Sequence, residues 1–394
     1  MTRRSLLLSP FPAFAGALVD ADGMLHLDGK RTFATGLYQL PQRPDPWRAA
    51  AEAGFLVAHC GSGEDLDKAR AHGMRGWMTT GSISAAKKDA DMARIKDRVA
   101  KFRRHPALLC WETEDEPSFA DKKPRSLRVP PESIRAAYRY LKSLDPERPV
   151  YLNHSPTHLV STLRQYNPGG DIVATDVYPV IPPGIRNQYA LWPDGRQGDL
   201  LNGFVSQTGQ YVDKMRQVAG PQRGVWMVLQ AFAWEMLRKA GDRDPRMIRY
   251  PTRDEMRFQA WQSIVHGATG LLWWGLTYTP AEASLWDELV DVMAEIKGMA
   301  PELAAPAVKL AVAVDYHETG HSLDRGIEWI AKPSGAGILL AAVNADPNPV
   351  DAALSGLGRY RRARAVSEGR SIRFAAGVLR DEFPPFGVRL YRLD

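Results

Sequence analysis

Residues 107–117 read ALLCWETEDEP, an apolar run of five residues that leads into four acidic side chains and a proline. The apolar run has the length and composition of a buried β-strand. Carboxyl groups crowded at the end of such a strand raise one another's pKa by desolvation and like-charge repulsion, and groups perturbed in this way concentrate at functional sites. The chemistry that this stretch indicates is general acid catalysis.

Similar apolar runs recur between residue 32 and about residue 300, and they alternate with helical patterns such as residues 91–103 and 133–144. Eight strand-and-helix units over about 270 residues match the size of an α/β protein of the TIM (β/α)8 barrel type. A doubly wound open sheet is the competing architecture, but no G-x-G-x-x-G motif follows an early strand. The eight expected strands are residues 32–38, 55–60, 74–78, 107–111, 150–152, 172–177, 225–229 and 270–274.

The two ends of the chain differ from this middle part. Residues 3–8 (RRSLLL) and 13–15 (AFA) resemble a twin-arginine export signal with its cleavage site, so we expect residues 1–17 to be a signal peptide and the protein to be periplasmic or secreted. Residues 18–300 are expected to form the barrel, preceded by a short hairpin with two Asp-Gly turns. Residues 301–394 contain only short strand patterns, which predicts a small C-terminal antiparallel β-sandwich.

Composition and motifs exclude several classes of function. The 51 basic and 45 acidic residues are spread along the chain, which argues against nucleic-acid binding, and no apolar run is long enough to cross a membrane. Cys60 and Cys110 lie in strand patterns and are expected to be buried free thiols. No metal-binding spacing joins His59 and His154 to carboxylates, and we expect neither a metal nor another cofactor. The sequence has no G-x-S-x-G motif, which argues against serine hydrolase chemistry.

Polar and aromatic residues gather at the ends of the expected strands. Because the carboxyl ends of barrel strands meet at one rim, these residues should line a common site. Carboxylates, amides and flat aromatic faces together are typical of a sugar-binding site. One of the two adjacent tryptophans should pack in the barrel and the other face the sugar, because neighbouring strand residues point to opposite faces. The candidate binding residues are Tyr38, His59, Asp115, Asn153, His154, Tyr178, Gln230, Trp273 and Trp274.

Residues 105–117 resemble the fourth strand of clan A glycoside hydrolases, the superfamily of cellulases and β-galactosidases, in which this strand ends W-x-x-x-N-E-P. The glutamate of that motif is the general acid/base, so the resemblance implies this role for Glu116. Residues 144–150 (LDPERPV), 176–179 (DVYP) and 267–270 (GATG) agree with it. The resemblance extends over about residues 30–300, and a C-terminal sandwich accompanies many such barrels. It implies an enzyme that cleaves the glycosidic bonds of an oligosaccharide or polysaccharide.

Two positions depart from the pattern of that family. Asp115 replaces the usual Asn, and Gln230 ends the seventh strand where the family nucleophile is Glu, so a retaining mechanism with a carboxylate nucleophile does not carry over. An inverting mechanism needs a second carboxylate, which Asp176 or Glu235 can supply. Alternatively, a group on the substrate acts as nucleophile with Gln230 or Tyr178 orienting it, or the barrel binds glycans without cleaving them. Structural roles also remain open for Asp176, as a partner of loop amides, and for Glu235, as a solvent-facing residue.

The expected loops after strands four and seven are rich in basic residues, which suggests an anionic glycan as substrate. Acidic neighbours favour the alternative, a solvated mixed charge. A third class of function, unrelated chemistry on the same barrel, also remains open because one fold hosts many activities. The basic residues are Lys122, Lys123, Arg125 and Arg128 in one loop and Arg238, Lys239, Arg243, Arg246, Arg249 and Arg253 in the other.

Overall fold

The computed structural model describes residues 18–120, 126–184, 189–191, 197–199, 202–316, 326–366, 368–370 and 372–394. The expected export signal at residues 1–17 and the basic residues at 122, 123 and 125 lie outside the described ranges. Within those ranges, none of the helices has both the length and the apolar character that crossing a bilayer requires.

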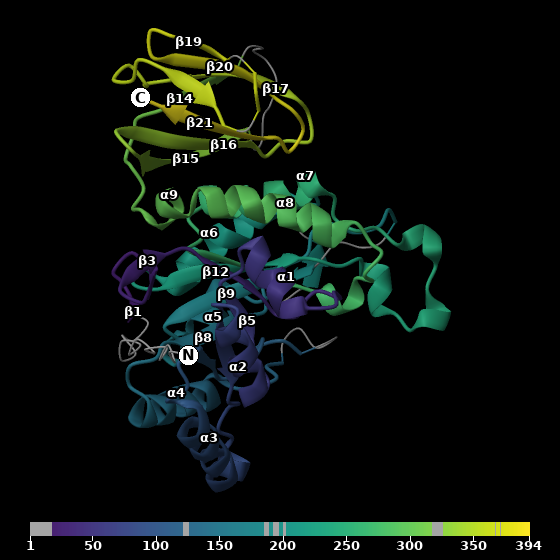
Figure 1. Cartoon of the computed structure of the whole chain (residues 1–394). Coiled ribbons are helices and arrows are strands. Elements are labelled where there is room, and N and C mark those ends of the chain that lie inside the picture. The colour runs from purple at the N-terminus through teal and green to yellow at the C-terminus, as the bar shows by residue number, and fades with distance from the viewer. Residues whose placement is uncertain are drawn as a thin grey trace, which may run out of the picture.

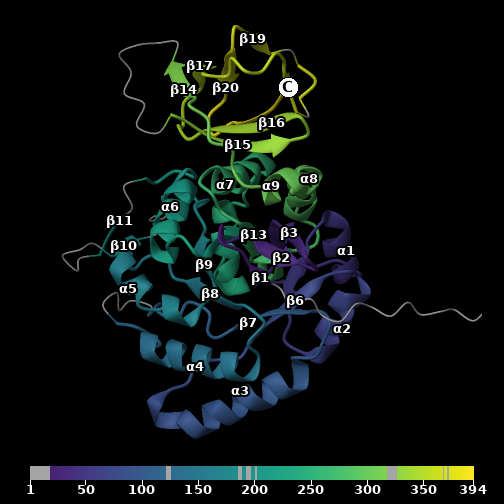
Figure 2. The same ribbon diagram turned by 90° about the vertical axis from the view of Figure 1, so that its left-hand side faces the viewer.

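Eight parallel strands close into a barrel, which confirms the predicted fold class (Figures 1 and 2). Each strand follows the one before it around the barrel, and the last pairs with the first: Gly270 of β13 lies opposite Ala34 of β4. The barrel strands are β4 (Ala34–Leu37), β5 (Val57–His59), β6 (Arg75–Thr79), β7 (Leu108–Glu112), β8 (Val150–His154), β9 (Ile172–Val177), β12 (Gly224–Gln230) and β13 (Gly270–Trp274).

Helices cover the outside of the barrel (Figure 2). Their starts follow from local sequence: Asp45 caps α1 ahead of Pro46, and Ser62 and Thr252 form capping boxes with the acidic residues three positions on. The helices are α1 (Pro46–Ala53), α2 (Gly63–Ala71), α3 (Lys88–Phe102), α4 (Pro131–Leu144), α5 (Val160–Arg164), α6 (Gln207–Ala219), α7 (Arg253–Val265), α8 (Leu285–Gly298) and α9 (Ala300–Ala304). Short 3-10 helices are η1 (Ala85–Lys87), η2 (Asn167–Gly169), η3 (Trp234–Leu237), η4 (Ala240–Asp242), η5 (Pro245–Met247) and η6 (Leu276–Tyr278).

Large aromatic side chains fill the barrel interior. Trp77, Tyr151 and Trp226 are buried there in one apolar cluster, each from a different strand. Gly270 makes room for them, since a Cβ atom at this position would lie 2.7 Å from the Trp226 ring. Successive residues on each strand alternate between this interior and the helical layer, so the strand pattern decides which side chains reach the mouth.

A small antiparallel sheet precedes the barrel and closes its N-terminal end. It consists of β1 (Leu18–Val19), β2 (Leu25–Leu27) and β3 (Lys30–Thr32). Leu25 is buried against the interior aromatic cluster, and Gly23 lies against the backbone of Gly224 at the start of β12. The opposite, C-terminal end of the barrel remains as the mouth.

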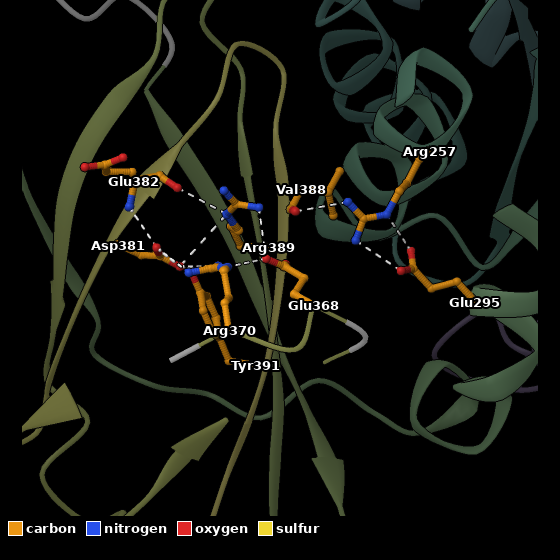
Figure 3. Close-up of polar contacts among 9 residues, drawn as sticks. All are labelled: Arg257, Glu295, Glu368, Arg370, Asp381, Glu382, Val388, Arg389 and Tyr391. Atoms are coloured by element: carbon orange, nitrogen blue, oxygen red, sulfur yellow. Dashed lines mark hydrogen bonds and ion pairs between the residues drawn. The ribbon is translucent and has the colours of Figure 1, made fainter. Parts of the chain in front are cut away.

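Two four-stranded antiparallel sheets form the C-terminal β-domain, as the sequence predicts (Figure 1). One sheet packs on the barrel helices α7 and α9, and Arg257 of α7 joins the two parts by donating to Val388 O at 3.0 Å while its guanidinium pairs with Glu295 (Figure 3). Two strands of the β-domain, β17 in one sheet and β18 in the other, show no clear strand pattern in the sequence. The residues of β17 are mostly small, and β18 has only three residues. The sheets are β14 (Ala313–Tyr316), β17 (Val350–Ser355), β20 (Val378–Phe383) and β19 (Arg373–Ala375), and β15 (Ile327–Ser334), β16 (Gly337–Asn344), β21 (Val388–Leu393) and β18 (Ala363–Ala365). A two-stranded sheet, β10 (Tyr189–Leu191) with β11 (Gln197–Asp199), lies between β9 and α6 in the chain.

Candidate active site

The acidic stretch lies at the mouth of the barrel, where β7 ends. Glu112 is the last residue of β7 and is buried, whereas Glu114 and Glu116 are partly exposed and Asp115 is exposed. The segment after β7 is held in place by Arg128, which lies farther along the same loop. Arg128 donates to the Glu114 carboxylate at 2.9 Å and to the backbone carbonyls of Asp115 and Glu116.

An asparagine links two of the carboxyl groups. The Nδ2 atom of Asn153, on β8, donates to Asp115 Oδ1 at 2.9 Å and to Asp176 Oδ1 at 2.7 Å. Tyr178 OH donates to the other oxygen of Asp176 at 2.9 Å. The structure therefore brings together four of the residues that the sequence nominates, which lie on β8 and β9 and just after β7 and β9.

Glu116 has an unusual backbone. Its φ is +40°, in the left-handed region that side chains with a Cβ atom avoid, and the residue stands before Pro117. Such a conformation costs about 1–3 kcal/mol and persists where the surrounding structure enforces it, most often at functional sites. Here the guanidinium of Arg128 on the Glu116 carbonyl supplies part of that constraint.

Burial and mutual repulsion keep protons on this cluster. Desolvation, followed by the repulsion of Asp176 and Asp115, raises the pKa of Glu116 well above its usual range. Desolvation and Asp115 together raise the pKa of Asp176 to about 7, although Asn153 and Tyr178 act in the opposite direction. Desolvation also raises the pKa of Asp115 and brings that of Glu112 to about 8. The cluster can therefore exchange protons near neutral pH, as an acid and a base must.

Gln230 ends β12, the seventh barrel strand, and its side chain is engaged by the backbone. Its Nε2 donates to Val180 O at 2.9 Å and Phe232 O at 3.0 Å, and its Oε1 accepts from Val180 N at 2.9 Å. The amide thus holds the loop after β9 against the loop after β12. A neutral, fully engaged amide can neither attack a sugar nor turn toward a substrate group.

Two other nominated residues face away from the carboxyl cluster. Glu235, in η3, accepts from Asp244 N at 2.7 Å and pairs with Arg238, so it organises its own loop. His154 follows Asn153 on β8 and points outward, where its ring packs edge-on against Tyr166. Burial lowers the pKa of His154 to about 3, so this imidazole is neutral.

The tryptophan pair divides between the two faces of β13. Trp273 is buried against Phe55 in the helical layer, and Trp274 is partly exposed at the mouth. The Trp274 ring stacks on Tyr178 with centroids 5.5 Å apart and lies beside Tyr278. Trp274 and its neighbours therefore form the flat apolar wall of the site.

The remaining nominated residues, Tyr38 and His59, line the other side. Tyr38 OH is 2.8 Å from Tyr151 OH, and His59 Nε2 is 3.2 Å from Thr79 Oγ1. Tyr151 was not nominated by the sequence, and Arg128 was nominated only as a basic residue that could attract an anionic substrate, not as a partner of the acidic loop. Strand alternation could have found Tyr151, two positions before Asn153, whereas only the tertiary fold brings Arg128 back to the acidic loop.

Most arginines of the basic loop after β12 contact groups within the protein. Arg238 pairs with Glu235, Arg246 with Asp244, and Arg249 with Glu255. Arg243 donates to two loop carbonyls, and Arg253 pairs with Asp254. Across the described ranges, no group of three His, Cys, Asp or Glu residues is arranged to hold a metal ion.

Comparisons with known proteins relate this chain by fold. No protein-family model matches it, and no curated protein matches its sequence. Among solved structures, it is similar to a glycoside hydrolase with a TM-score of 0.61 and 14% identity over 96% of each chain. A glycoside hydrolase family 5 protein from Bacteroides vulgatus gives a TM-score of 0.59 and 14% identity, over 96% of this chain and 94% of that chain. An α-amylase from Geobacillus thermoleovorans gives 0.56 and 10%, over 93% and 99%. The chain shares the barrel and β-domain architecture of these glycoside hydrolases.

Proposed function

We propose that this protein is a glycoside hydrolase in which Glu116 is the general acid and Asp176 the base that activates water. The observation that carries this proposal is the cluster of carboxyl groups at the barrel mouth, which Asn153 links. Burial raises the pKa values of both Glu116 and Asp176, and the charge of Asp176 adds to the shift of Glu116. Near neutral pH Glu116 then keeps its proton while Asp176, with a pKa of about 7, is partly ionised, which provides an acid and a base at once. The similarity of fold to glycoside hydrolases supports the assignment.

Asp176 is preferred to Glu235 as the second carboxylate. Asp176 points into the mouth between Asn153 and Tyr178, whereas Glu235 is occupied by Asp244 N and Arg238. With Gln230 in place of a carboxylate on β12, the mechanism is inverting: Glu116 protonates the leaving oxygen and Asp176 removes a proton from the attacking water. After the reaction Glu116 is ionised and Asp176 is protonated, and proton exchange with solvent restores their starting states.

The substrate is a carbohydrate, and a neutral one is favoured over an anionic one. Trp274, stacked on Tyr178, offers an apolar face to a sugar ring. Arg238, Arg246 and Arg249 of the loop after β12 pair with carboxylates of the protein, which weakens their attraction for a sulfate or carboxylate on a substrate. Rates on neutral and uronic glycans, compared across a salt series, check this: a steep loss of uronic-glycan cleavage with salt would favour the anionic substrate.

The experiment that tests the function is hydrolysis of a panel of aryl glycosides and soluble polysaccharides by the wild-type chain, Glu116→Gln and Asp176→Asn. Glu235→Gln is the matched control, since it also removes one buried carboxylate near the mouth. We expect both site variants to lose at least a hundredfold in kcat while the control loses only stability. Equal rates for wild type and Glu116→Gln would refute the role of Glu116.

The anomeric configuration of the first product, followed by NMR, tests the mechanism. Inversion supports Asp176 as base. Retention instead supports participation by a substrate group, oriented by Tyr178, because the described mouth lacks a carboxylate on β12.

A glycan-binding barrel without catalysis is the second candidate, and the replacement of the expected nucleophile by Gln230 favours it. If this is the function, no panel member is cleaved, and Glu116→Gln changes only the affinity for glycans in a binding titration.

We also propose that the protein is exported, on the basis of the arginine pair and apolar run in residues 1–17. Mass spectrometry of the N-terminus of the protein from its native cells tests this. A mature chain that retains residue 3 would contradict it.

A further inference from the structure

Glu112 lies deeper in the mouth than the proposed catalytic pair. It ends β7 with its side chain toward the barrel interior and is only 1% exposed. Thr79 Oγ1, on the neighbouring strand β6, donates to Glu112 Oε2 at 2.6 Å. The other carboxyl oxygen, Oε1, is buried and has no hydrogen-bond partner among the residues that the structure describes.

The hydrogen bond from Thr79 occupies one of the two Glu112 oxygens. With the hydroxyl hydrogen of Thr79 on Glu112 Oε2, Thr79 Oγ1 can accept from His59 Nε2, 3.2 Å away, when the imidazole carries its hydrogen on that nitrogen. Burial lowers the pKa of His59, which favours the neutral ring. Glu112 Oε2 is thus the acceptor at the end of a donor chain, and a proton on this carboxyl belongs on Oε1.

The surroundings of Glu112 favour that neutral form. Desolvation and the charge of Asp115, with a smaller contribution from Asp176, raise the pKa of Glu112 to about 8, although the hydrogen bond from Thr79 and the neighbouring Trp77 indole act in the opposite direction. A carboxylic acid in such a place can donate a hydrogen bond, which a carboxylate cannot. The titratable groups that face Glu112 from the other elements are Tyr38 after β4, His59 on β5, Tyr151 on β8, Asp176 on β9 and Asp115 in the loop after β7.

A second buried polar atom in the mouth also lacks a partner. Asn153 Oδ1 accepts no hydrogen bond from the described residues, although the Nδ2 of the same amide makes two. Asn153 and Glu112 face the interior on neighbouring strands. A sugar hydroxyl is both donor and acceptor, so it suits a site that presents a donor from Glu112 and an acceptor from Asn153.

We propose that Glu112 is a substrate-positioning residue that acts as a neutral acid: Thr79 holds one oxygen, and the O–H on the other donates to an oxygen of the sugar bound deepest in the mouth. This inference rests on the proposed function. It assigns Glu112 no part in bond cleavage, and it makes the ionisation of Glu112 the event that ends substrate binding at high pH.

Two variants separate a neutral donor from an ionised carboxylate. Glu112→Gln retains a donor group and an acceptor for Thr79 but cannot ionise, whereas Glu112→Leu keeps the size and removes both. The measurement is kcat/KM against pH, with the fastest aryl glycoside of the panel. We expect wild type to lose activity as pH rises through about 8, where Glu112 ionises, ahead of any further loss from Glu116. Glu112→Gln should stay within about threefold of wild type at pH 6.5 and lose the decline near pH 8. Glu112→Leu should lose about ten- to a hundredfold at every pH through KM, the usual effect of removing a hydrogen bond to a substrate oxygen.

Three results would overturn the inference. Glu112→Gln as inactive as Glu112→Leu would mean that the ionised form is the working one. An alkaline decline retained in Glu112→Gln would assign that decline to another group. Full activity in Glu112→Leu would remove Glu112 from the site altogether.

A measurement that does not depend on activity keeps this inference distinct from the proposed function. Carboxyl ¹³C NMR of glutamate-labelled protein, with Glu112→Gln to assign the resonance, should show one carboxyl that titrates near pH 8. If wild type cleaves no glycoside yet this titration is seen, the hydrolase proposal fails while the neutral acid stands. A Glu112 carboxyl that ionises below pH 6 refutes the neutral acid, whatever the activity.

Discussion

Replacing Asn153 with alanine should move the pH dependence of the enzyme in a direction that the structure specifies. Asn153 Nδ2 donates at 2.7 Å to Asp176 and at 2.9 Å to Asp115. Hydrogen bonds to the ionised form of a carboxyl lower its pKa, so their loss disfavours the Asp176 carboxylate.

The size of the effect follows from the strength of one hydrogen bond to a charged group, about 1.5–3 kcal/mol. Since 1.36 kcal/mol corresponds to one pH unit, the pKa of Asp176 should rise from about 7 by roughly one to two pH units. Below pH 7 the ionised fraction of the base then falls about ten- to a hundredfold. The ratio of variant to wild-type kcat/KM should therefore rise between pH 6 and pH 9, although the ionisation of Glu112 lowers the activity of both proteins above pH 8.

The assay is kcat/KM for wild type and Asn153→Ala between pH 5 and pH 10. Asn344→Ala is the matched control because Asn344 is equally buried and its Nδ2 also donates twice, to Asn348 O and Pro384 O in the β-domain. The control should lose stability without any displacement of the profile. An Asn153→Ala profile that falls in parallel at every pH, or that moves to lower pH, would refute the reasoning.

Three further predictions concern other parts of the molecule. Gln230→Glu should lower the melting temperature and leave the product anomer unchanged, because a carboxylate there faces Val180 O and Phe232 O without donors for them; a stable variant that turned to retention would contradict this. Asp213 and Glu328 flank His266 at 3.0 Å each and raise its pKa to about 9, so its contribution to stability should be full below about pH 6.5 and disappear as pH rises through 9; thermal melts of wild type against His266→Gln test it, and a difference that grew with pH would be wrong in sign. Cys60 is buried with its pKa raised to about 12 and Cys110 is buried too, so a thiol reagent at pH 8 should label neither until the protein unfolds, and fast labelling of the native chain would show otherwise.

The barrel could be predicted from the sequence because its signal is local. Each apolar run between turn residues is a strand by itself, and the strand at residues 172–177 matches the observed β9 in both bounds. Alternation along β8 and β13 likewise separates interior from exterior positions before any fold is known. The β-domain was harder to predict strand by strand, since residues 350–355 are largely small and residues 363–365 form too short a run for a pattern.

The sequence by itself determined the barrel and its mouth, because strand periodicity and the order of the units can be read along the chain, whereas Glu116 was nominated within the acidic stretch by the resemblance of residues 105–117 to clan A glycoside hydrolases. Only the tertiary structure decided how those residues are used. In the structure the Gln230 amide hydrogen-bonds to backbone groups, and Glu235 accepts from a backbone amide of its own loop. Asn153 donates to two carboxyl groups. Hydrogen-bond partners, burial and repulsion between charges depend on distances across strands far apart in sequence, and these exist only once the barrel has closed.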